Sequence, residues 1–221
     1  MNVGCWNVRG VNQTFKQQEI RNFITRNMIS LLGIQETRAS ASSSGPIIQH
    51  LMRGWRYLTN YASHPNRRIW VIWDPNVLDV SQIFVDAQVI HVHSTIIQRQ
   101  ITFQATFAYG LNSYMERRKL WDCLEAISIS LTSDPWTVLG DFNAVRFPGE
   151  MLGGNLSWAP YMDELNDCCL RTGLEDLRFS GSFLTWSKGE GESFKARKLD
   201  RVLINQEWAS SFPSAEAIFQ T

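Results

Sequence analysis

The stretch WTVLGDFN, residues 136–143, joins an expected strand to two polar residues, Asp141 and Asn143. Its first five residues, 136–140, form a short and mostly apolar run, which predicts a strand. Asp141 and Asn143 follow this strand at once. An Asp-x-Asn sequence after a strand is more often a turn cap than a functional site, so this motif indicates a site only together with others.

Polar residues of the same kind end other expected strands. The strands predicted at 2–6 and 30–35 run into Asn7 and Glu36, and Asp200 lies inside an apolar stretch. Carboxylates and amides at strand ends face one rim of a sheet sandwich, and their oxygen atoms suit Mg²⁺. Such an ion suits phosphate-ester hydrolysis, because it polarises the phosphoryl oxygen and stabilises the leaving oxygen.

The rest of the pattern is dominated by strands. Short strands are also expected at 55–60, 69–73, 79–84, 89–93, 101–107, 183–187, 199–204 and 215–219. Helices are expected at 16–28, at 161–171 and from a capping box at 113–116 onward, with Trp121 and Leu124 facing the core. The low-complexity stretch 39–46 (ASASSSGP) predicts a surface loop. Directly successive strands favour an α/β fold of two mixed sheets packed together with outer helices, in a single domain, 1–221.

Composition excludes several other classes of protein. The 221 residues are 44% hydrophobic, and 21 basic residues balance 21 acidic ones, so bulk charge does not favour coating of nucleic acid, although a local basic patch stays open. The four cysteines form no Cys-x-x-Cys pair, which predicts reduced thiols and an intracellular protein. No apolar run reaches about 18 residues, so no membrane span is expected.

Several segments carry a family resemblance when they are taken together. They are WNVRG (6–10), GIQETR (33–38), Tyr-Gly (109–110), RRKLW (117–121), VLGDFNAV (138–145), GEMLGG (149–154), GLEDL (173–177), GSFLTWS (181–187), KLDRVLIN (198–205) and EWASSFPSA (207–215). The chain resembles the endonuclease/exonuclease/phosphatase superfamily, and within it the endonuclease domain of plant LINE-type (non-LTR) retrotransposons. The resemblance implies a four-layer α/β/β/α sandwich of the DNase I-like type.

The resemblance also implies roles for individual residues. Glu36 would be the main ligand of Mg²⁺ (or Mn²⁺), with Asn7 beside it. Asp141 would orient or deprotonate the attacking water, and Asn143 would hydrogen-bond the phosphoryl oxygens. Tyr109 would contact the scissile phosphate.

The expected partner is DNA. The resemblance implies that Thr185 and Trp186 lie at a strand end that faces DNA, and that Arg118 also contacts DNA. The LINE branch nicks one DNA strand, and the freed 3′ hydroxyl primes reverse transcription. The expected location is therefore nuclear, and nothing in the sequence indicates a protein partner or an oligomer.

Asp200 would hold a catalytic histidine, and here the sequence departs from the family. The family's Ser-Asp-His follows the strand predicted at 215–219, whereas this chain stops at Thr221. We therefore expect a C-terminally truncated domain that lacks its last strand and this motif. From the residues alone, Arg197 or Arg201 could instead neutralise Asp200 for structural reasons.

The histidines present all lie upstream of the expected position. They are His50, His64, His91 and His93. His91 and His93 share one face of a strand and could bind a metal, although ordinary solvent-facing side chains are the favoured interpretation. Losing one member of a concerted catalytic group commonly costs several orders of magnitude in rate, so we expect weak or absent nicking.

Three functions are thus compared. The first is a Mg²⁺-dependent DNA-nicking endonuclease of retrotransposon origin. The second is a non-catalytic relic or binding module of the same fold, against which zero net charge argues because phosphate contacts dominate DNA affinity. The third, a superfamily phosphatase, has the least weight because GEMLGG and GSFLTWS resemble the retrotransposon branch.

Overall fold

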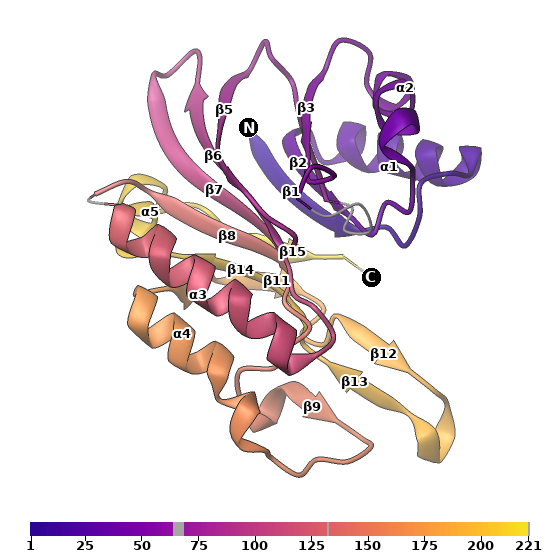
Figure 1. Cartoon of the computed structure of the whole chain (residues 1–221), viewed down its shortest axis with the longest axis vertical. Coiled ribbons are helices and arrows are strands. Elements are labelled where there is room, and N and C mark those ends of the chain that lie inside the picture. The colour runs from indigo at the N-terminus through magenta and orange to yellow at the C-terminus, as the bar shows by residue number, and fades with distance from the viewer. Residues whose placement is uncertain (64–68, 132, 221) are drawn as a thin grey trace. The chain divides into compact units, whose positions relative to one another are not determined.

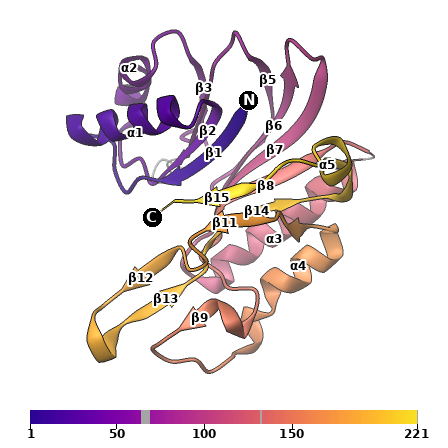
Figure 2. The ribbon, with the colours of Figure 1, turned by 180° about the vertical axis from the view of Figure 1, so that it is seen from behind.

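The computed structural model describes residues 1–63, 69–131 and 133–220. The chain divides into two compact units, unit 1 (Met1–Tyr109) and unit 2 (Gly110–Thr221), whose elements are labelled in Figure 1 and seen from behind in Figure 2. The expectation of one domain over 1–221 stays a prediction. Within the described ranges, no helix is both long and apolar enough to cross a membrane.

Unit 1 contains every strand that the sequence predicts before residue 110. Its elements are β1 (Asn2–Asn7), α1 (Thr14–Arg26), β2 (Ile29–Gln35), α2 (Ala41–Leu51), β3 (Arg56–Thr59), β4 (Trp70–Trp73), β5 (Leu78–Val85), β6 (Val89–Ile96) and β7 (Ile101–Tyr109). The first four strands form a mixed sheet in the order β1-β2-β4-β3, in which β1 and β2 are parallel. The strands β5, β6 and β7 pair antiparallel in sequence order.

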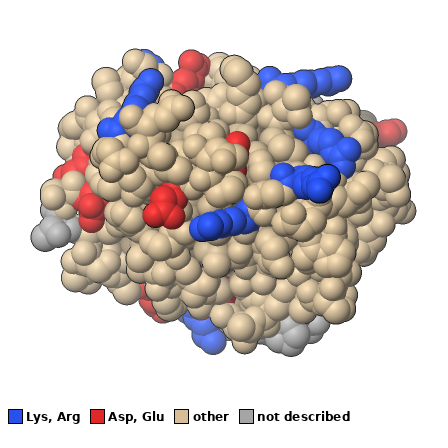
Figure 3. Space-filling model, turned by 90° about the horizontal axis from the view of Figure 1, so that it is seen from above, with Lys and Arg blue, Asp and Glu red and all other residues tan. Residues whose placement is uncertain are grey.

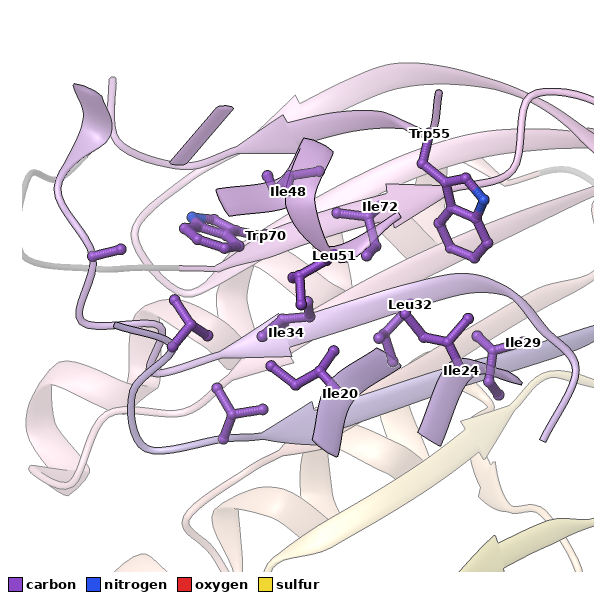
Figure 4. Packing of buried hydrophobic residues seen from close by; sticks show 13 residues of the cluster. Ile20, Ile24, Ile29, Leu32, Ile34, Ile48, Leu51, Trp55, Trp70 and Ile72 are labelled. Carbon is purple, nitrogen blue, oxygen red and sulfur yellow. The ribbon is translucent and has the colours of Figure 1, made fainter. Parts of the chain in front are cut away.

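The helices α1 and α2 bury their apolar side chains on this mixed sheet, as Figure 4 shows. Ile20 and Ile24 lie one turn apart on α1, and neither side chain is more than 2% exposed. They belong to the same cluster as Leu32 of β2. Each fully buried aliphatic side chain contributes about 1.5–3 kcal/mol. This packing fixes β1 and β2, at whose ends Asn7 and Glu36 lie.

The other face of β2 packs against β7. A Cβ atom added to Gly33 would lie 2.2 Å from the ring of Phe107, so only glycine permits this close approach. The buried side chain of Gln35 donates from Nε2 to the carbonyl of Ala108 at 2.5 Å. Unit 1 therefore has three layers: helices, the mixed sheet, and the antiparallel strands.

In unit 2 the longest element is a helix, and most of the strands are short. Its helices are α3 (Tyr114–Ser130), α4 (Glu164–Thr172), α5 (Gln206–Ser211) and the short η1 (Pro148–Glu150), η2 (Pro160–Met162) and η3 (Gly191–Ser193). Its strands are β8 (Trp136–Asp141), β9 (Met151–Leu152), β10 (Glu175–Asp176), β11 (Phe179–Gly181), β12 (Trp186–Lys188), β13 (Lys195–Arg197), β14 (Asp200–Ile204) and β15 (Ala217–Phe219). β14 pairs antiparallel with β8 and β10, and β13 with β12 and β9.

The helix α3 forms as its capping box predicts. The side chain of Ser113 accepts a hydrogen bond from the backbone N–H of Glu116 at 3.5 Å. Trp121 and Leu124 are 3% and 0% exposed, which confirms the prediction that both side chains face the core. Trp121 stacks on Phe142, just after β8, and α3 lies beside α4 in both ribbon views. Unit 2 therefore has a strand layer and a helix layer.

A buried ion cluster joins β14 to its surroundings in unit 2. Arg201, which is 1% exposed, pairs with Glu150 and lies 2.9 Å from Asp176 (Nη1 to Oδ1). Asp176 also pairs with Arg146 at 3.1 Å and with the buried Lys198 at 3.5 Å. These charges are compensated by one another, as buried ions must be.

The prediction of a surface loop at 39–46 is wrong, because α2 begins at Ala41. Ser40 caps this helix by accepting a hydrogen bond from the backbone N–H of Ser43 at 3.2 Å. Ser44 and Ile48, four residues apart, are both buried. Because most residues of this stretch are small and polar, the sequence shows no clear helical spacing of apolar residues. Pro46 is tolerated inside the helix because tertiary burial outweighs local helix propensity.

The interpretation of His91 as solvent-facing is also wrong. His91 is 2% exposed, and its Nδ1 lies 2.8 Å from Oγ1 of Thr106 on β7. Beside it, Nδ1 of His93 lies 3.0 Å from Nε2 of Gln104. The polar face of β6 and β7 is therefore buried as well, which alternation along the sequence cannot distinguish from an exposed face.

The burial of His91 predicts a pH-dependent stability. Burial lowers the pKa of His91 from 6.5 to about 4. Because the unfolded chain binds this proton more readily, the free energy of unfolding is expected to decrease by about 3 kcal/mol as pH falls from 6.5 to 4. Urea unfolding across this range measures the effect. His91→Gln should remove this part of the slope, whereas His50→Gln, at an exposed site, should retain it. An unchanged slope in His91→Gln would contradict the prediction.

Candidate active site

The first group of predicted residues comes together in unit 1, at the ends of β1, β2 and β7. Oε1 of Glu36 accepts a hydrogen bond from Nδ2 of Asn7 at 2.9 Å and from the hydroxyl of Tyr109 at 3.0 Å. Glu36 has a left-handed backbone, with φ of 50°, which costs energy for a residue other than glycine. The parallel pairing of β1 with β2 brings Asn7 next to the end of β2. The three predicted residues are therefore adjacent.

The carboxylate of Glu36 is held in its charged form. Its second oxygen, Oε2, lies 3.1 Å from a guanidinium nitrogen of Arg38. Burial raises the pKa of Glu36, but the hydrogen bonds from Asn7, Tyr109 and Arg38 and the charge of Arg38 outweigh it, so that the pKa is lowered overall. Glu36 is therefore ionised at neutral pH and available to a cation.

The second group lies in unit 2, where β8 and β14 pair. Asp141 and Asp200 are directly opposite each other in the antiparallel register. Directly opposed residues have Cβ atoms about 4.5–5.5 Å apart, and like charges there repel. The hydroxyl of Thr185 accepts hydrogen bonds from the backbone N–H groups of Leu199 and Asp200 at 3.1 and 2.9 Å. Thr185 thus fixes the backbone from which Asp200 extends.

Asn143 is held in place by several contacts. Its φ is 47°, its backbone N–H donates to Oδ1 of Asp141 at 2.9 Å, and its Nδ2 donates to the carbonyl of Gly110 at 2.8 Å. A Cβ atom at Gly110 would lie 2.2 Å from the carbonyl oxygen of Phe142, so this loop requires glycine. The buried Arg117 donates to the carbonyls of Leu111 and Asn143. Asp141 and Asn143 are thus positioned by one network.

The remaining predicted DNA contacts lie in unit 2, where Arg118 is exposed and Trp186 is half-buried. Arg118, on α3, pairs with Glu164 of α4 at 2.7 Å, and its guanidinium lies 5.5 Å from the ring centre of Tyr114. Trp186 begins β12 and is directly opposite Arg197 on β13. Neither position tests the predicted contact with DNA.

The arginines considered as partners of Asp200 bind other groups. Arg201 pairs with Glu150 and Asp176. The guanidinium of Arg197 donates to the backbone carbonyls of Leu152, Gly153 and Asn155.

Three residues with supporting roles escaped the sequence-based assignment. Arg117 lies in the motif RRKLW, but only the exposed Arg118 was selected from it. Arg38 lies in GIQETR, and Glu150 in GEMLGG accepts hydrogen bonds from the backbone N–H groups of Arg146 and Phe147. The motifs contain all three residues, but residue type alone does not show which of their side chains are buried or paired.

The described histidines all belong to unit 1. His50 is exposed on α2, His91 and His93 lie on β6, and His64 lies outside the described residues. His91 and His93 are hydrogen-bonded to Thr106 and Gln104 of β7. Each contact engages Nδ1 of the ring within its own sheet.

Oxygen ligands for a divalent cation are present at Glu36. Within the described ranges, no cluster of three or more His, Cys, Asp or Glu side chains is arranged to hold a metal. Mg²⁺, however, is commonly bound through one or two carboxylates while it keeps several waters. The ionised, partly exposed carboxylate of Glu36 beside the amide of Asn7 fits such a site.

The sequence comparison defines the class of protein. The Endonuclease/Exonuclease/phosphatase family matches residues 4–218. This chain belongs to that family, which confirms the predicted superfamily. A search of curated proteins finds no match.

Solved structures agree with this assignment of the fold. The endonuclease domain of TRAS1, a telomere-specific non-LTR retrotransposon, is similar with a TM-score of 0.69 and 15% identity, over 92% of this chain and 84% of that chain. The AP endonuclease LMAP from Leishmania major has a TM-score of 0.71 and 12% identity, over 93% and 79%. The mannosyl-6-phosphatase Bt3783 from Bacteroides thetaiotaomicron has a TM-score of 0.58 and 12% identity, over 92% and 85%. The predicted mixed α/β, DNase I-like fold is confirmed.

Proposed function

We propose that the chain is a Mg²⁺-dependent, DNA-nicking endonuclease of the LINE-type retrotransposon class. The observation that carries the proposal is the ionised carboxylate of Glu36, which is placed by a left-handed backbone and held by Asn7, Tyr109 and Arg38. The similarity to the TRAS1 endonuclease domain supports the retrotransposon branch. A DNA substrate would make a nuclear location the natural one.

The chemistry follows from the donors that each group offers. Glu36 and Asn7 would hold Mg²⁺ or Mn²⁺, which polarises a phosphoryl oxygen and stabilises the leaving oxygen. Asp141, a carboxylate fixed by the Asn143 loop, would orient the attacking water and accept its proton. The amide of Asn143 has a second N–H that can donate to a phosphoryl oxygen. Tyr109 would contact the scissile phosphate.

The hairpin of β12 and β13 supports DNA as the substrate. Trp186 is opposite Arg197, and Lys188 is opposite Lys195. Side chains two residues apart on a strand share a face, so all four lie on one face of the hairpin. Two opposed lysines repel each other, and a nucleic-acid phosphate would relieve this repulsion while the indole offers a stacking surface.

One protein with a similar fold, from Bacteroides thetaiotaomicron, is named a mannosyl-6-phosphatase, so a phosphatase is an alternative function for this chain. The face in Figure 3 carries interspersed Lys, Arg, Asp and Glu side chains on a mostly uncharged surface. This mixture suits a local contact with DNA more than a broad electrostatic one. A phosphatase or a binding module remains the alternative that the assay must separate.

A nicking assay on supercoiled plasmid distinguishes these functions. With protein in excess of plasmid, so that a slow first turnover is visible, we expect conversion to the open circle in Mg²⁺ or Mn²⁺ and none with chelator. A phosphomonoester such as p-nitrophenyl phosphate should not be hydrolysed. Hydrolysis of the phosphomonoester without nicking would favour the phosphatase, and DNA binding without either reaction would favour the binding module.

A further inference from the structure

The side chain of Arg38 is directed onto the predicted metal ligand by a fixed backbone. Arg38, like Glu36, is left-handed, with φ of 52° against 50°. Thr37 between them is fully buried, and its carbonyl accepts from the backbone N–H of Val11 at 2.9 Å. The carbonyl of Arg38 accepts from Nδ2 of Asn12 at 2.9 Å. Such costly backbone geometry persists only where its surroundings impose it, and here the loop after β1 does so.

The two oxygens of Glu36 have partners of different kinds. Oε1 accepts from the neutral groups of Asn7 and Tyr109. Oε2 faces the cationic guanidinium of Arg38, whose side chain is 61% exposed against 23% for Glu36. An ion pair with so exposed a partner is weak and readily exchanged. Oε2 is therefore the oxygen that an incoming cation can reach at least cost.

We propose that Arg38 occupies the cation position at Oε2 of Glu36 in the metal-free protein and leaves that oxygen when a divalent cation binds. Arg38 thereby sets the metal affinity of the site. The displacement follows from charge: a divalent cation on Oε2 repels the guanidinium, and the exposed side chain can move away into solvent. This inference rests on the proposed function, because it requires Glu36 to be the metal ligand.

Binding of Mn²⁺ to the DNA-free protein tests the role of Arg38 without an activity assay. Electron paramagnetic resonance of free Mn²⁺, or calorimetry, gives the dissociation constant. Arg38→Gln is expected to bind Mn²⁺ roughly fivefold more tightly than the wild type, because a competing cation of an exposed pair is removed. The thermal midpoint should be unchanged, since Arg38 is largely exposed.

Arg9→Gln is the matched control for charge alone. Arg9 is exposed in the neighbouring loop and is also left-handed, with φ of 53°. Its replacement removes the same charge nearby, and we expect a gain in affinity below about twofold, because exposed charges are screened by salt. Glu36→Gln should abolish the binding event.

The outcomes separate the two proposals. If Glu36→Gln abolishes binding but Arg38→Gln binds no more tightly than the wild type, the role of Arg38 is overturned and the metal site stands. If Arg9→Gln gains as much affinity for Mn²⁺ as Arg38→Gln, the role of Arg38 is also overturned, because the effect would then come from the general electrostatic field of the nearby charges. If Mn²⁺ binds the wild type and Glu36→Gln alike, or does not bind the wild type, both proposals fail.

Discussion

Replacing Glu36 by Gln is expected to lower the rate of Mg²⁺-dependent plasmid nicking by at least about 10³-fold, since one transition-state donor alone is commonly worth 10²–10³ and a metal ligand more. Glutamine has nearly the same shape, and its amide oxygen can still accept from Asn7 and Tyr109. It lacks the negative charge that a divalent cation requires. The measured quantity is the first-order rate of conversion of supercoiled to open-circular plasmid, with protein in excess.

Glu19→Gln is the control for that substitution. Glu19 lies on α1, is 51% exposed and pairs with Lys16 at 2.8 Å, so its loss should leave the nicking rate within about twofold. Glu36→Asp keeps the charge but shortens the side chain by one methylene, and its rate should fall between those of the wild type and Glu36→Gln. Nicking by Glu36→Gln within tenfold of the wild-type rate would remove Glu36 from the metal site.

The residues of the candidate site were accessible from sequence because strand ends are local features. The strands that end at Asn7, Glu36 and Asp141 are predicted from their apolar runs, and the parallel pairing of β1 with β2 brings Asn7 next to the end of β2 in unit 1. The helix over Ala41–Leu51 was missed because its polar run carries little local signal and its stability comes from burial on the sheet.

Roles that depend on contacts distant in sequence were not predictable. His91 lies on an alternating strand, and its burial, like that of Thr106 directly opposite it, depends on tertiary packing and not on the local pattern. Thr185 was assigned to DNA, yet its hydroxyl accepts two backbone N–H groups 14 and 15 residues later in the chain. The same holds for Glu150, whose partner Arg201 is 51 residues away.

Replacing Arg201 by Met is expected to lower the free energy of unfolding by about 3–5 kcal/mol, the usual cost of breaking a buried ion pair by removing one partner. Glu150 would lose a charged partner, while Asp176 would keep Arg146 and Lys198. Methionine fills a similar volume, so the loss reflects uncompensated charge more than a cavity. Urea unfolding of both proteins at pH 7 measures the difference.

The control is Arg171→Met, which breaks a pair of similar length in an exposed setting. Arg171 lies 2.7 Å from Glu125, with side chains 53% and 31% exposed, and such pairs are worth about 0–1 kcal/mol. Equal losses in the two variants would show that the cluster around Arg201 is not a desolvated one.

A third measurement uses the dependence of stability on pH. Burial raises the pKa of Asp176, but Arg201, Lys198 and Arg146 outweigh it and lower the pKa below its usual value of 3.8. A depressed carboxyl pKa stabilises the fold above the unfolded value, and this stability is lost as pH falls through the folded pKa. The wild type should therefore lose stability as pH falls below about 4, and Arg201→Met should lose less over the same range, because the largest charge that lowers the pKa of Asp176 has been removed.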